Sequence, residues 1–200
     1  MMENKPVTIS SREILEVFKE KLNKIVPISL NQIFGPNAET KISSEGGIYL
    51  FWWTGPSRTF TKQARLHRHL IKGKQTENEK INIRFSPEWI GEATKKNGIC
   101  LYAGKTSCLK KRIASHIKPK TENIWGDKKH TSDKKPNTVS QMRIGIEKIF
   151  QTYEGLDLIL KNVSISYIEM NDVENCVNRF YLENSIIGDY FPLLNVDVER

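Results

Sequence analysis

The sequence contains few cysteines and no long hydrophobic run. Its three cysteines, Cys100, Cys108 and Cys176, are odd in number and lack CxxC spacing, which argues against a disulfide framework and a structural zinc site. No apolar run approaches the roughly 20 residues that span a bilayer. The first residues, MMENKPVTISSREILEVF, show no apolar core followed by a small-residue cleavage site, so we expect no secretory signal. These absences predict a reducing, cytoplasmic compartment and no membrane partner.

The chain is basic and long enough for one elaborated domain. It has 200 residues, with 31 Lys and Arg against 23 Asp and Glu, and a formal net charge of +8. A chain of this length can bury a core without disulfide or metal staples. Its basic charge suggests a polyanionic partner, which could be DNA, RNA or an anionic membrane surface. Charge alone does not choose among them.

The charge is unevenly distributed along the chain. Residues 58–84 hold eight bases and two acids, and residues 103–120 hold six bases and no acid. Residues 154–200 hold nine acids and three bases. Each basic run by itself could be an ordinary solvated face. Two acid-poor segments so close together favour a surface that faces phosphate groups.

Hydrophobic patterning predicts an α+β fold built on a small central sheet of about three strands, mixed or antiparallel, with flanking helices. The expected strands are 47–53, 98–103 and 162–168. The expected helices are 10–26, 61–72, 87–96, 107–117, 139–152 and 172–190. We expect a single domain over residues 1–200, with core segments 46–53, 98–118 and 162–195 and two large insertions, 54–97 and 119–153.

One carboxylate stands out on the last expected helix. Glu183 lies in the middle of an apolar and aromatic stripe with four-three spacing that includes Phe180 and Ile187. Burying an unpaired carboxylate is costly, so this position needs a cation, a metal or several hydrogen-bond donors. A partly exposed glutamate at the edge of the stripe, or one paired with an arginine, is the simpler alternative.

A second pair of polar residues shares one helical face. Arg112 and His116 are four residues apart on the 107–117 helix. That helix starts just after Gly104, Lys105 and Thr106, so its N-terminus is a potential phosphate site. Ordinary snorkelling of the arginine and a surface histidine would also explain the pair.

These residues fall into an ordered pattern. Gly47-Ile48-Tyr49 on one strand, Tyr102-Ala103-Gly104 on another, Arg112 eight residues after that glycine, and Glu183 followed twelve residues later by Asn195 together resemble the GIY-YIG nuclease family. The stretch YAGKTSCLKKRIASHI also looks like the corresponding segment of bacterial excinuclease C subunits. The sequence departs from the family at Ala103, where Ile or Val is usual, and in the long insertion 54–97 between the two strands.

The resemblance implies cleavage of phosphodiester bonds with a divalent cation. It implies that Glu183 holds one Mg²⁺ or Mn²⁺ ion per site, and that Arg112 neutralises the scissile phosphate. Tyr49 would act on the attacking water as a base or as an orienting group, with help from Lys105 or His116. The remaining implied site residues are Tyr102, which would donate a hydrogen bond near the phosphate or the water, and Asn195, which would hold the substrate or the backbone around the site.

The compact chain most resembles the Type II restriction endonucleases of that family. We see no added DNA-binding module of the homing type, and three cysteines cannot make the zinc domain of the eukaryotic structure-specific enzymes. Double-stranded DNA is therefore the expected substrate, in a bacterial or phage intracellular setting. A homodimer is possible, because one site per chain must cut two strands. The candidate DNA-binding residues are Arg65, His67, Arg68, His69, Lys72, Lys110, Lys111 and Arg143.

The roles of the basic insertions stay open in two respects. A helix that carries Arg and His could enter a major groove, but contact with the backbone alone is at least as good an explanation. The alternative functions are a homing or other DNA-processing nuclease of the same family and a catalytically weak nucleic-acid-binding module. A basic RNA-binding domain is a weaker candidate, because GIYLFWW is too apolar for an exposed base-stacking strand.

Overall fold

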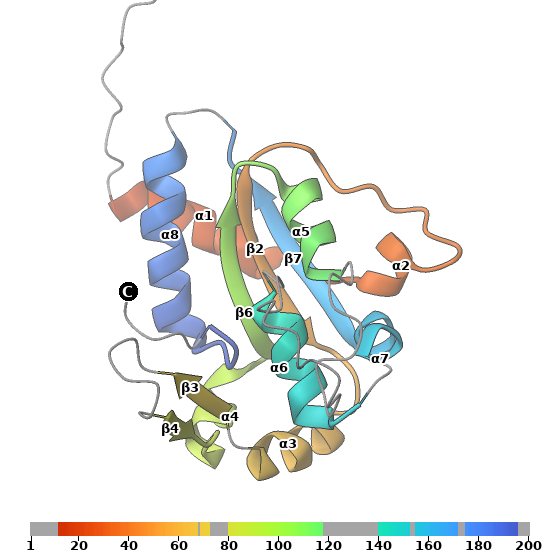
Figure 1. Ribbon diagram of the computed structural model, residues 1–200. Helices are drawn as coiled ribbons and strands as arrows, with labels where there is room; N and C mark the ends of the chain where they lie inside the picture. The colour runs from red at the N-terminus through yellow and green to blue at the C-terminus, as the bar shows by residue number, and fades with distance from the viewer. Residues whose placement is uncertain are drawn as a thin grey trace, which may run out of the picture.

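A five-stranded antiparallel sheet forms the centre of the molecule, in the order β1-β7-β2-β6-β5. Figure 1 shows it in a computed structural model, which describes residues 12–67, 69–72, 80–117, 140–152, 155–171 and 175–195. The strands are β1 Ile28–Ser29, β2 Gly47–Trp53, β5 Thr94–Lys95, β6 Gly98–Thr106 and β7 Val163–Glu169. A separate hairpin pairs β3 His69–Lys72 with β4 Lys80–Ile83.

The α+β class is confirmed, but the expectation of about three strands is wrong. The three long strands lie where the apolar runs predicted them. The two additional strands, β1 and β5, have two residues each and pair at the sheet's edges, with β7 and β6 respectively. A two-residue strand is too short to produce an alternating pattern, so hydrophobic periodicity could not reveal it.

Eight helices surround the sheet in the described part of the chain. They are α1 Arg12–Lys24, α2 Leu30–Phe34, α3 Ser57–Leu66, α4 Pro87–Ala93, α5 Leu109–Ile117, α6 Gln141–Phe150, α7 Gly155–Asn162 and α8 Asn175–Tyr190. The helix expected over 61–72 is wrong in its second half: α3 starts earlier, at Ser57, and the residues after Leu66 turn into β3. No helix among these described residues is long and apolar enough to cross a membrane.

Strand β2 is buried on both of its faces, which explains its continuous apolar sequence. Tyr49, Phe51 and Trp53 pack into one core, together with residues of α2 to α7. Alternate residues of the same strand, such as Leu50 and Trp52, pack into a second core with α1 and α8. In Figure 1, α8 and α1 accordingly lie across the sheet from α5, α6 and α7. The sheet therefore separates two helical layers.

Helix α8 does not bury the stripe that its sequence suggested. Its buried apolar residues are Leu182 and Ile186, four residues apart, whereas Phe180 is 49 % exposed and Cys176 is also exposed. The helix is rotated by about one residue from the expectation. Glu183 therefore lies at the border of the buried face rather than in the middle of an apolar one.

Candidate active site

The pairing of β2 with β6 places Tyr49 opposite Gly104. A Cβ atom built on Gly104 would lie 2.5 Å from the Tyr49 hydroxyl oxygen. Any side chain at this position would therefore displace the phenol. The glycine is needed for a close approach across the two strands, and this explains why a tyrosine and a glycine occur together here.

The Tyr49 hydroxyl contacts two residues of α5. It lies 2.9 Å from His116 Nε2 and accepts a hydrogen bond from Arg112 Nε at 3.2 Å. The ring stacks on Tyr102 with 6.2 Å between ring centroids. Because Arg112 and His116 are one helical turn apart, α5 brings both onto the same phenol. The structure thus brings together four of the predicted site residues.

Burial controls the ionisation of this cluster. It raises the pKa of Tyr49 well above its usual value, with a further contribution from Tyr102 and opposition from the Arg112 charge. Burial also raises the pKa of Tyr102, again against the effect of Arg112. Burial, together with the nearby Arg112, lowers the pKa of His116 to about 3. Both phenols are consequently protonated, and the imidazole is neutral, near pH 7.

The N-terminus of α5 is not the phosphate site that the sequence suggested. The amide of Leu109 donates to the carbonyl of Glu45 at 2.8 Å, and the amide of Lys110 donates to the carbonyl of Ser43 at 2.9 Å. The Cys108 amide donates to the Thr106 hydroxyl. Donors that are already paired to the protein's own carbonyl and hydroxyl oxygens do not form a free anion site. Arg112 is the α5 cation that contacts the Tyr49 hydroxyl.

Lys105 and Glu183 form the other half of the site, at the edge of β6. The Lys105 amide donates to Glu183 Oε1 at 3.1 Å, and its ammonium contacts Glu183 Oε2. The same ammonium lies 5.0 Å from the ring centroid of Phe180, on the preceding turn of α8. The charge of Glu183 also raises the pKa of both Tyr49 and Tyr102. The carboxylate therefore lies within electrostatic reach of the phenol cluster.

Asn195 closes the edge of β6 next to the site. Its Oδ1 accepts from the Ala103 amide at 2.7 Å, and its Nδ2 donates to the Ala103 carbonyl at 2.8 Å. Just before it, the amides of Leu193 and Leu194 donate to the carbonyls of Cys100 and Leu101. Of the two roles expected for Asn195, this geometry matches the one of holding backbone.

Glu183 is the carboxylate that contacts the site residues through Lys105. Among the residues that the structure describes, no group of three or more His, Cys, Asp or Glu side chains could hold a metal. Mg²⁺ can be bound through one or two carboxylates while its other ligands are waters and substrate phosphate oxygens. Glu183 fits such an ion if the Lys105 ammonium moves away from Oε2.

The predicted DNA-contacting residues fall into three groups. Lys110, Lys111 and Arg65 are exposed, and His67 is half-buried. Arg143 is buried: it donates to Glu147 Oε1 and to the Ile117 carbonyl, both at 2.7 Å, so its guanidinium is held by protein acceptors instead of facing solvent. Arg68 and the side chains of His69 and Lys72 lie outside the described residues.

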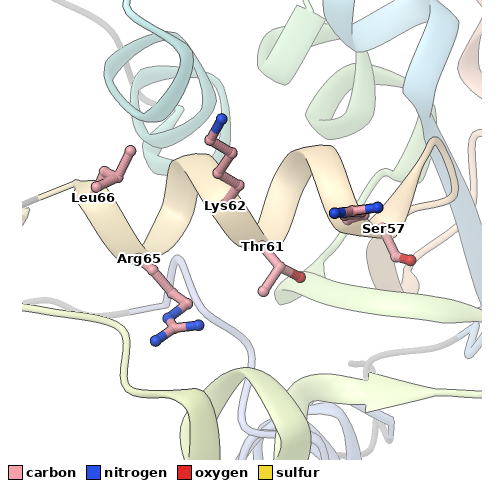
Figure 2. A pocket seen from close by; sticks show the side chains of 6 residues that line it. Ser57, Thr61, Lys62, Arg65 and Leu66 are labelled. Atoms are coloured by element: carbon pink, nitrogen blue, oxygen red, sulfur yellow. The ribbon is translucent and has the colours of Figure 1, made fainter.

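Helix α3 carries a basic face that extends beyond the residues singled out from the sequence. Arg58, Lys62 and Arg65 follow four-three spacing, with hydroxyl groups from Ser57 and Thr61 beside them. These residues line an open cleft of about 610 Å³, shown in Figure 2. The five-residue set, Ser57, Arg58, Thr61, Lys62 and Arg65, is called the α3 basic face below.

Sequence reasoning also missed the roles of Ser140 and Phe180. Ser140 is the N-cap of α6, and its hydroxyl also lies 3.0 Å from His116 Nδ1. Phe180 was placed in a buried stripe, whereas it lies exposed beside the Lys105 ammonium. Neither contact has a local sequence signal, because each joins residues that are distant in the chain.

Comparisons with known proteins add no relative. A scan of family models gave no match, and searches of curated proteins and of solved structures found no similar chain.

Proposed function

We propose that the protein is a Mg²⁺-dependent endonuclease of the GIY-YIG type that hydrolyses phosphodiester bonds in double-stranded DNA and acts as a sequence-specific Type II restriction enzyme. The observation that carries this proposal is the convergence of Tyr49, Arg112 and His116 within reach of the Lys105 and Glu183 pair. These groups supply an oxygen that can orient water, a permanent cation and a single metal-binding carboxylate.

Each residue has a distinct task in the proposed reaction. Burial keeps the Tyr49 phenol protonated in the free protein. Its oxygen therefore orients the attacking water and does not take a proton from it. The Arg112 guanidinium, which always carries its charge, neutralises the scissile phosphate. Glu183 holds the metal ion, and Lys105 turns from the carboxylate toward the phosphate. When bound, Mg²⁺ would act as a Lewis acid on a phosphate oxygen.

The exposed basic residues extend the proposed DNA surface away from the site. Lys110 and Lys111 are exposed on α5 beside the site. The α3 basic face lies on a helix packed into the same core as α5, and α6 contacts both helices. Lysine and arginine on one helix face fit the phosphate backbone, which carries sequence-independent affinity.

Digestion of a mixed-sequence phage DNA tests the proposed activity. Incubation with Mg²⁺ should give discrete fragments, and EDTA or Glu183→Gln should prevent them. A smear would point to a nonspecific nuclease of the same chemistry. Equal cleavage by the wild type and by Glu183→Gln would overturn the assignment of the site. Light scattering with and without cognate DNA tests the expected homodimer.

One observation favours a second candidate, a nucleic-acid-binding module with little catalysis. The Glu183 carboxylate is already paired with the Lys105 ammonium and with the Lys105 amide, so neither of its oxygens is free to bind a metal ion in this arrangement. If this pair is permanent, the protein would bind DNA without cutting it. Binding measured by fluorescence anisotropy, together with no cleavage at any Mg²⁺ or Mn²⁺ concentration, would support this candidate over the nuclease.

A further inference from the structure

Behind the Tyr49 phenol, a chain of hydrogen bonds runs into the start of α6. His116 connects the two ends: Nε2 lies 2.9 Å from the Tyr49 hydroxyl, and Nδ1 lies 3.0 Å from the Ser140 hydroxyl. Ser140 is the N-cap of α6, and its oxygen also accepts from the Arg143 amide at 3.0 Å. A single serine therefore caps a helix and contacts the candidate catalytic histidine.

The three side chains of this hydrogen-bonded network are buried in the free protein. Tyr49 and His116 are fully buried and Ser140 is 3 % exposed. Tyr49, Phe51 and Tyr102 lie against the imidazole with their rings, at centroid distances of 5.6, 5.1 and 5.3 Å. Water cannot readily replace Ser140 as the partner of Nδ1, so the tautomer of His116 depends on the protein.

Two arrangements of the hydrogen atoms satisfy the two distances from the His116 ring nitrogens. In the first, Tyr49 donates to Nε2 while Nδ1–H donates to Ser140. In the second, Ser140 donates to Nδ1 while Nε2–H donates to Tyr49. A neutral imidazole carries one N–H, so the two arrangements exclude each other. The low pKa of His116, about 3, keeps the imidazole neutral near pH 7.

The donor and acceptor strengths favour the first arrangement. A phenol is far more acidic than an aliphatic alcohol, so Tyr49 is the stronger donor to an imidazole lone pair. The oxygen of Ser140 is the better acceptor, because its lone pairs are not delocalised into a ring. The hydrogen bond from Arg112 Nε to the Tyr49 oxygen polarises the phenol further in the same direction.

The geometry points to Ser140 as a positioning residue: its hydroxyl holds His116 in the tautomer protonated at Nδ1, so that Nε2 accepts from Tyr49 and the phenolic oxygen keeps one lone pair for a water molecule. In the other tautomer, Arg112 and His116 both donate to the Tyr49 oxygen and use both of its lone pairs. The phenol could then not accept from an attacking water. This inference rests on the role of Tyr49 in the proposed function.

The tautomer can be measured without DNA. In protein with ¹⁵N-labelled histidine, long-range ¹H–¹⁵N correlation spectra near pH 7 distinguish a protonated from an unprotonated ring nitrogen. His116→Gln identifies the resonances of His116 among the four histidines. We expect Nδ1 protonated and Nε2 unprotonated in the wild type and in Ser140→Thr, with a shift toward the other tautomer in Ser140→Gly. A wild-type spectrum with Nε2 protonated would overturn the inference.

Cleavage kinetics separate the effect on His116 from the effect on the helix cap. Ser140→Gly and Ser140→Ala both remove the hydroxyl, but glycine is a tolerated N-cap and alanine is a poor one. We expect kcat to fall about tenfold in both variants, with KM for DNA unchanged and with recovery in Ser140→Thr. A loss of kcat that follows the stability of the variants, larger in Ser140→Ala than in Ser140→Gly, would contradict the inference. If the wild type cuts no DNA, the proposed function fails while the ¹⁵N result still decides the tautomer.

Discussion

The glutamate–cation pair within α6 and the one that joins β6 to α8 differ in their surroundings. Arg143 and Glu147 are one turn apart on α6, with side chains only 10 % and 5 % exposed. Lys105 and Glu183 come from β6 and α8, with side chains 37 % and 16 % exposed. The first pair faces packed protein, including the Ile117 carbonyl that Arg143 also binds. The second pair faces the rim of the candidate active site.

This difference in exposure separates a structural pair from one that can open. Arg143 is a fork of donors fixed by two protein acceptors, and removing either member of a buried pair leaves an uncompensated charge. Lys105 is a flexible, strongly hydrated cation, and a partly exposed pair is held by about 1 kcal/mol or less. The Glu183 carboxylate can therefore exchange its ammonium partner for a metal ion, whereas Glu147 cannot.

The largest expected effect is on cleavage, for the substitution Glu183→Gln. The amide has the same shape but loses the charge that the metal ion needs, so the rate should fall on the order of 10³-fold. Thermal unfolding should show a transition within a few degrees of that of the wild type. Single-turnover cleavage of a fluorescent duplex measures the rate. Unchanged cleavage would remove Glu183 from the chemistry.

Glu147→Gln is the matched substitution on the other pair, and its effect should be on stability. It leaves the buried Arg143 guanidinium without its counter-charge and should reduce the free energy of unfolding by about 3 kcal/mol. That corresponds to a fall in Tm of roughly 6–12 °C for a chain of this size. Urea unfolding followed by tryptophan fluorescence gives the first value, and calorimetry gives the second. A variant as stable as the wild type would show that the buried pair is not structural.

The contrast between the pairs also shows where sequence reasoning succeeds. The continuous apolar run of β2 and the Leu109, Ile113 and Ile117 stripe of α5 were predictable, because burial of those residues follows strand or helix periodicity. The residues gathered around Tyr49 could be proposed only because their order resembles that of a known family, not from periodicity. The burial of Arg143 could not be predicted, since it depends on how α6 packs against the rest of the protein.

The features that could not be predicted from the sequence depend on contacts between residues that are distant in the chain. The two-residue strands exist because other segments lie beside them, and Ser140 acquires its contact with His116 across 24 residues of sequence. Helix α8 is rotated from its expected face: Leu182 and Ile186 belong to the core, whereas Phe180 is exposed. The local sequence pattern identifies which apolar residues could be buried, but tertiary packing determines which of them are buried.

The loss of stability at low pH should show whether His116 belongs to the packed interior, like Arg143, or to the open rim of the site, like Lys105. The folded pKa of about 3 is below the ordinary value of 6.5, so between these two pH values the unfolded chain binds a proton that the native protein does not. Stability is therefore present above pH 6.5 and is lost as the pH falls toward 3. Between pH 7 and 4.5 the wild type should lose about 2–3 kcal/mol more than His116→Gln.

Urea unfolding of both proteins at the two pH values measures this difference, and the contribution of the other titrating groups cancels between them. Parallel losses in the two proteins would mean that His116 can be protonated in the folded state. The imidazole would then be part of an open site, like Lys105, rather than of the packed interior.

The smallest expected effect comes from Lys105→Met, which opens the exposed pair without removing the carboxylate. Stability should change by less than about 1 kcal/mol, because the pair is partly solvated. Without the competing ammonium, Glu183 should bind Mg²⁺ about fivefold more tightly in the absence of DNA, equivalent to ~1 kcal/mol. Isothermal titration with Mg²⁺ measures this, with Glu183→Gln as the non-binding control. If Lys105→Met destabilises the protein as much as Glu147→Gln does, the two pairs are alike and Glu183 has a structural role. If the Lys105→Met variant binds Mg²⁺ no more tightly than the wild type, the Lys105 ammonium does not compete with Mg²⁺ for the Glu183 carboxylate.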